Sequence, residues 1–187
     1  MKKILVVVAI IAIGFGIWRY FKKPPNNDSP FPQIKVDESK LTEKGLAVLA
    51  EIRSSVKELE NDPDNLSLIC KKSLGIASRL QEIGAYGSAG DWYLFVIENR
   101  KKLESRKKLD PLWGRESFVP SMYSAAAMCF FLDNQNEKAI SICKTCDANY
   151  PKEAIFNIML KYSKTPSNPV WVATQKLYKP NPEYVKP

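Results

Sequence analysis

Hydrophobic side chains recur three and four residues apart through most of the chain, which is the period of an α-helix. Residues 41–60 show this pattern at Leu49 and Ile52, and residues 66–83 continue it up to Gly84, which is placed to end a helix. Further helices are predicted in four places: from Trp92 into the basic residues up to Lys108, over 120–132, over 137–149 and over 152–162. The chain is therefore expected to be all-α.

Small residues recur where two of the predicted helices would cross. Ala126 and Ala127 lie on one helix and Ala139 on the next, and antiparallel helices approach closely only where side chains are small. Tyr123 and Phe130 are placed to fill the space beside the crossing. One such hairpin keeps an unburied apolar face, so we expect it to stack on a neighbour.

The order of these residues resembles a tetratricopeptide repeat (TPR), a helix hairpin of about 34 residues. The residues that carry the resemblance are Tyr123, Ala126, Ala127, Phe130, Ala139, Cys143 and Pro151. A second copy lies 50 residues upstream (139 − 89 = 50), with Gly84 and Tyr86 in its turn, and consists of Ser73, Ile76, Ala77, Leu80, Ala89 and Tyr93. The resemblance implies stacked antiparallel helix hairpins, a TPR-like α-solenoid. An unrelated helical bundle is the alternative.

The first 23 residues are interpreted as a single N-terminal transmembrane helix. An uncharged run from Ile4 to Trp18 has basic residues on both sides, and Tyr20 and Phe21 extend it toward the roughly 20 residues that a span needs. We expect residues 4–21 to be an uncleaved signal anchor; a cleaved signal peptide and a buried helix are the alternatives. A short basic N-terminus before a folded domain favours a domain on the exported, periplasmic or lumenal, side.

Proline-rich segments flank the predicted helical domain of residues 41–164. Residues 24–40 contain four prolines and are interpreted as a linker that spaces the domain from the bilayer. Residues 165–187 contain five prolines together with Trp171, Tyr178 and Tyr184, and are predicted to be an extended tail. Such a tail is a loose terminus, or an arm that lies along a partner or back on the domain.

The formal net charge is +8, and the chain contains no histidine. A histidine general base and histidine metal ligands are therefore excluded. The densest basic cluster is Arg100, Lys101, Lys102, Arg106, Lys107 and Lys108. On a helix these residues wrap around the axis, so the cluster is interpreted as a solvated helix end or as a contact for anionic lipid or an acidic partner. Nucleic acid is not expected, because no aromatic residues alternate with the basic ones.

Four cysteines are the candidates for chemistry: Cys70, Cys129, Cys143 and Cys146. The last two form a CxxC, but the pair lies late in a predicted helix, whereas a redox CxxC belongs at a helix N-terminus that lowers the thiol pKa. We expect buried packing, with a disulfide or a metal site as alternatives. The chain shows no glycine-rich phosphate loop, nucleophile elbow or catalytic carboxylate pair. Neither enzymatic activity nor a cofactor is predicted.

Together these features predict a membrane-anchored, TPR-like scaffold or assembly adaptor that binds other proteins and has no catalytic role. Its expected partners are proteins at the membrane and the bilayer itself, which residues 4–21 would enter. The alternative is a structural accessory subunit of a larger membrane protein complex.

Overall fold

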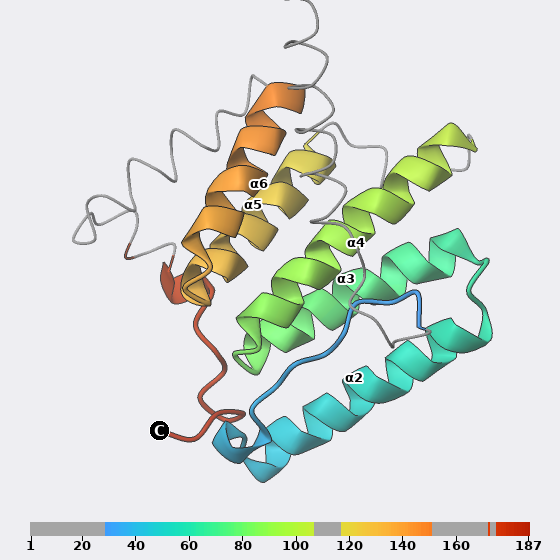
Figure 1. The fold of residues 1–187 in the computed structure, drawn as a ribbon. Helices are drawn as coiled ribbons and strands as arrows, with labels where there is room; N and C mark the ends of the chain where they lie inside the picture. The colour runs from blue at the N-terminus through green and yellow to red at the C-terminus, as the bar shows by residue number, and fades with distance from the viewer. Residues whose placement is uncertain (1–28, 107–116, 151–171, 173–174) are drawn as a thin grey trace, which may run out of the picture. The chain divides into compact units, whose positions relative to one another are not determined.

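The computed structural model describes residues 29–106, 117–150, 172 and 175–187, which are coloured in Figure 1. Their helices are the 3-10 helix η1 (Glu38–Lys40) and the α-helices α2 (Glu43–Asn61), α3 (Leu66–Glu82), α4 (Tyr86–Ser105), α5 (Phe118–Leu132) and α6 (Asn136–Asn149). These residues form no β-strand, only an isolated antiparallel bridge between Leu41 and Val185. The predicted all-α class is confirmed.

Several predicted features lie outside the described residues: the anchor at 4–21, the helix at 152–162, Pro151, Lys107 and Lys108. Within the described ranges, no helix is long and apolar enough to cross a membrane. The described residues from Phe31 onward belong to one compact unit.

Each helix packs mainly on the next one in the chain: α2 on α3, α3 on α4, α4 on α5 and α5 on α6. Side-chain caps fix the starts of the first two, because the Thr42 hydroxyl accepts from the Gly45 N–H and the Asn65 side chain accepts from the Leu68 N–H. One apolar cluster runs through all five α-helices and includes Leu49, Leu80 and Phe130. The order of packing therefore follows the order of the sequence.

The α3–α4 and α5–α6 hairpins turn in the same way. In each turn one residue has left-handed backbone geometry, Gly84 at φ 76° and Asn134 at φ 59°. Its N–H donates three residues back and the next N–H donates five residues back, which is the Schellman arrangement. The bonds are Gly84 to Gln81 (3.0 Å) and Ala85 to Leu80 (2.8 Å), then Asn134 to Phe131 (3.1 Å) and Gln135 to Phe130 (2.8 Å). Equivalent turn residues are 50 apart (134 − 84 = 50), the same offset as in the sequence pattern.

α4 begins at Tyr86, earlier than the sequence predicts, so the small residues 87–90 lie inside the helix. Their size is needed for contact with the second hairpin. A Cβ added at Gly87 would lie 2.5 Å from Asp133 Oδ2, and one added at Gly90 would lie 2.6 Å from the Phe130 ring. The Asp133 side chain is exposed and can move, whereas the Phe130 ring is buried, so at Gly90 close packing of α4 on α5 outweighs the unfavourable helix propensity of glycine.

A charged contact joins the two hairpins beside this crossing. Lys138 on α6 pairs with Asp91 on α4 at 2.7 Å, and its ammonium lies 3.9 Å from the centroid of the Phe130 ring on α5. A cation over an aromatic face is attracted by the ring, in addition to its ion pair. Lys138 therefore connects three helices at one point.

Residues 31–40 differ from the linker that the sequence predicts. Phe31 is buried, with its ring 6.3 Å from that of Trp92 and 5.6 Å from that of Phe95, both on α4. The Lys35 N–H donates to the Ser88 hydroxyl, which in turn donates to the Lys35 carbonyl. Because an aromatic ring here finds an apolar site on α4, this part of the segment packs on the helices and does not act as a spacer.

Two helical glycines give a matched test of this packing. Gly90→Ala places a methyl group against the buried Phe130 ring and should lower the free energy of unfolding by about 1 to 3 kcal/mol. Gly75→Ala on α3 meets nothing within 4 Å and should raise it by about 0.5 to 1 kcal/mol through helix propensity alone. Denaturant unfolding of both variants measures the difference. Equal effects would contradict the close approach of α4 and α5.

Candidate interaction surfaces

The residues that carry the repeat resemblance lie in the core. All those within the described ranges are buried: Ile76, Ala77, Leu80, Ala89, Tyr93, Tyr123, Ala126, Ala127, Phe130, Ala139 and Cys143. Residues that are 50 apart share this burial, as in the pairs Ala77 and Ala127 or Ala89 and Ala139. These positions support the hairpins and are not available to a partner.

The basic cluster at the end of α4 is divided by the fold. Arg100 is buried and pairs with Glu104 at 3.0 Å, whereas Lys101, Lys102 and Arg106 are exposed. The Lys102 ammonium donates to the Asn99 side chain at 3.3 Å. The exposed members keep the predicted capacity to contact anionic lipid or an acidic partner, and Arg100 does not share it.

All four cysteines are buried thiols and form no disulfide. Burial raises the pKa of Cys70 to about 11 and the pKa values of Cys129 and Cys143 to about 12, because an apolar surrounding disfavours the thiolate. Cys143 and Cys146 lie on the buried face of α6, away from its N-terminus. The described residues contain no group of three or more His, Cys, Asp or Glu side chains that could hold a metal ion.

The C-terminal tail lies across the start of α2 and the α3–α4 turn (Figure 1, where it is red). Three main-chain hydrogen bonds hold it: Asn181 N–H to Glu82 O (2.8 Å), Thr42 N–H to Tyr184 O (3.0 Å) and Lys186 N–H to Lys40 O (2.8 Å). Of the roles that the sequence leaves open for this tail, its described part lies back on the domain. It is not extended throughout, as the sequence predicts: residues 175–177 are helical, and residues 181–184 form a turn in which the Tyr184 N–H donates to the Asn181 carbonyl at 2.9 Å. The surface beneath it, formed by Leu41, Thr42, Gly45, Glu82, Gly84 and Tyr86, is called the tail site below.

Side chains complete the tail site. The Thr42 hydroxyl donates to the Glu183 carbonyl and the Tyr86 hydroxyl donates to the Tyr178 carbonyl, each at 2.6 Å. Lys44 pairs with the Glu183 carboxylate at 3.0 Å. In the sequence, only the prolines and tyrosines of the tail signal these contacts, because main-chain partners carry no residue pattern.

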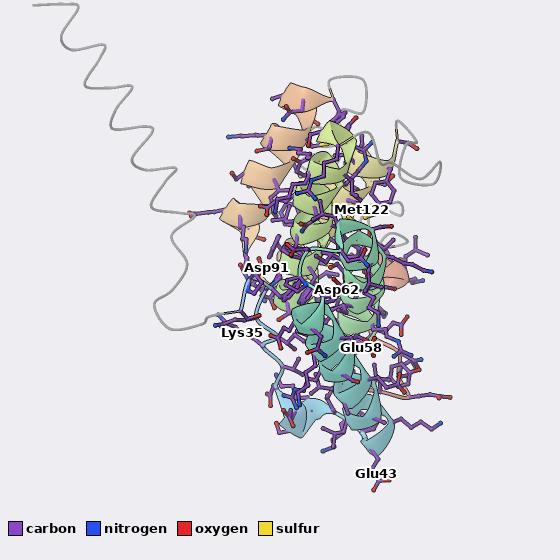
Figure 2. All side chains as sticks on the ribbon, turned by 90° about the vertical axis from the view of Figure 1, so that its right-hand side faces the viewer. Lys35, Glu43, Glu58, Asp62, Asp91 and Met122 are labelled. Atoms are coloured by element: carbon purple, nitrogen blue, oxygen red, sulfur yellow. The ribbon has the colours of Figure 1, made fainter. Side chains whose placement is uncertain are left out.

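A groove with a volume of about 360 Å³ runs between α2 and α3. It is lined by Ile52, Ser55, Leu68, Lys71, Lys72, Gly75, Ile76 and Arg79. Ion pairs from Lys72 to Glu58 and from Arg79 to Glu51 cross it from α3 to α2. Figure 2 shows Glu58 toward one end of α2 and Glu43 at the other. The groove combines an apolar floor with charged edges and is open where Gly75 lacks a side chain.

Comparison with known proteins gives no relative for this chain: no protein-family model, no curated protein and no solved structure matches it.

The buried thiols predict a chemical behaviour. The pKa values of Cys70, Cys129 and Cys143 are raised well above 9, so their thiolate forms are scarce at pH 8, and burial blocks access to all four thiols. An aromatic disulfide reagent at pH 8 should therefore modify no cysteine in the folded protein and all four after unfolding in guanidinium. Fast modification of one native thiol would contradict the packing role of that residue.

Proposed function

We propose that this protein is a membrane-anchored, non-catalytic scaffold or assembly adaptor that binds other proteins through a TPR-like helical domain. The observation that carries the proposal is that the helical unit holds polypeptide from outside its hairpins on its surface at two places. Phe31 and Lys35 contact α4, where the Lys35 main chain bonds to the Ser88 hydroxyl, and residues 178–186 contact the tail site, where main-chain groups bond to each other. A surface with these donors and acceptors suits peptide segments of other proteins.

The repeat interpretation is supported by the equivalence of the two hairpins. α3–α4 and α5–α6 share the buried positions, the left-handed turn residue and the Schellman hydrogen bonds at one offset of 50 residues. We propose that they are two TPR-like units, with α2 packed on the first. The residues beyond the usual repeat length of about 34 are accounted for by the long α4 and the connection that follows it.

The anchor is part of the proposal and rests on sequence. The uncharged run in residues 4–21, with basic residues on both sides, has the composition of a membrane span. The exposed Lys101, Lys102 and Arg106 and the net charge of +8 fit contact with anionic lipid or an acidic partner. We place the helical domain on the exported side of that membrane.

The α2–α3 groove offers the most direct test of partner binding. Gly75→Phe fills the groove with an aromatic ring, and Ser78→Phe adds the same ring at an exposed position of α3 that does not line it. We expect the intact, detergent-solubilised protein to co-purify with a defined protein partner in wild-type and Ser78→Phe form. The amount of partner that co-purifies with the Gly75→Phe protein should fall at least about tenfold, because close contacts in a groove tolerate little added volume.

Two outcomes would count against this role. Absence of any stoichiometric partner in the wild-type capture would contradict the scaffold itself. A single large particle that resists dissociation and is unaffected by either phenylalanine would favour the structural accessory subunit.

A further inference from the structure

The tail site is shaped to receive a peptide main chain. Gly45, in the first turn of α2, has no side chain, and a Cβ there would lie 2.1 Å from the Tyr184 carbonyl oxygen. Gly84 has a φ of 76°, and a Cβ there would lie 3.4 Å from the Pro180 ring. The first glycine makes room for a bound carbonyl, and the second gives the turn on which a proline rests. At these two glycines the tail therefore approaches the domain more closely than a side chain would allow.

The tail is held lightly on this surface. None of the described residues between 175 and 187 is fully buried, and Leu177 is 78% exposed. Its ion pair, Lys44 to Glu183, has both side chains more than half exposed, so water and salt screen it. What remains is a short series of hydrogen bonds, three between main-chain groups and three from the side chains of Thr42, Tyr86 and Lys186, together with the half-buried Tyr178, Tyr184 and Val185. Segments with few buried apolar contacts separate from a domain at low free energy.

We infer that the tail site is a peptide-binding site which the C-terminal tail occupies within its own chain, and that a segment of a protein partner with the same turn as residues 181–184 replaces the tail there. The inference rests on the proposed role in binding proteins. The contacts define the chemistry of that segment. It carries a proline over Gly84, a carboxylate beside Lys44, and an aromatic residue on each side of the proline, as Tyr178 and Tyr184 flank Pro180.

A protein partner fits this site better than the tail of a second copy. A tail bound within its own chain is present at an effective concentration on the order of millimolar, so the same peptide from another copy competes poorly at ordinary protein concentrations. A partner segment gains additional contacts elsewhere on its own protein, and such contacts raise its effective concentration in turn. Exchange of the tail for a partner is then a competition that the partner can win.

The test uses the full chain and a labelled synthetic peptide with the sequence of residues 176–187. In wild type the tail blocks the site, so binding should be weak. Tyr184→Ala combined with Val185→Ala removes half-buried side chains of the tail without touching the tail site, and should raise peptide affinity at least about tenfold, because the intramolecular competitor is weakened. Adding Gly45→Ala to this protein should abolish the gain, and adding Gly75→Ala should preserve it.

A charge exchange provides a second, independent reading. Lys44→Glu in the weakened-tail protein should reduce binding of the natural peptide by about threefold and restore it for a peptide that carries lysine in place of Glu183, as expected for an exposed ion pair. A scrambled peptide is the control.

Three results would overturn the inference. The first is that the weakened-tail protein binds no peptide although it unfolds at the wild-type temperature. The second is that Gly45→Ala does not change peptide binding. The third is that the wild-type protein is a dimer and that the tail substitutions dissociate it. The last would assign the site to the tail of a second copy. None of these results affects the capture of a partner through the α2–α3 groove. The capture experiment with Gly75→Phe therefore tests the scaffold proposal separately.

Discussion

The close approach of α4 and α5 at Gly90 is the contact on which the arrangement of the helices depends. With no side chain at this position, the Phe130 ring lies directly on the α4 backbone, and the two hairpins come near enough for Lys138 to reach Asp91. A Cβ at Gly90 would have to displace a fully buried ring, and a well-packed core resists such a shift. The small residues Ala77, Ala89, Ala126, Ala127 and Ala139 extend the same constraint along the core.

Features that depend on periodic burial could be predicted from the sequence. The five α-helices, the buried alanines and the offset of 50 residues between the two hairpins follow from side-chain size and spacing, which are local properties of the chain. The start of α4 could not be found in this way. Gly87 and Gly90 indicate a turn by their low helix propensity, yet both lie inside α4, and at Gly90 the buried Phe130 ring occupies the space that a Cβ would need.

Contacts between segments that are distant in the sequence could not be predicted from its local pattern either. Phe31 follows several prolines, which suggests that it belongs to a linker. Its ring instead packs on those of Trp92 and Phe95, about sixty residues later in the chain. Arg100 belongs to a run of basic residues, which suggests that its side chain is exposed, but the side chain is buried and pairs with Glu104. The tail site consists largely of main-chain groups, two glycines and a capping threonine, none of which has a distinctive order along the chain.

We expect the two hairpins to be stable and the C-terminal tail to separate from them at a lower free energy, and hydrogen exchange of the intact protein measures this difference most directly. Amides of Asn181 and Lys186, and that of Thr42, donate only to contacts between the tail and the domain, whereas those of Ala85 and Gln135 close the two hairpin turns. We expect the first group to exchange at least about a hundredfold faster than the second, because the tail opens without unfolding of the helices. Equal protection of both groups would show that the tail separates only on global unfolding, and would contradict this expectation.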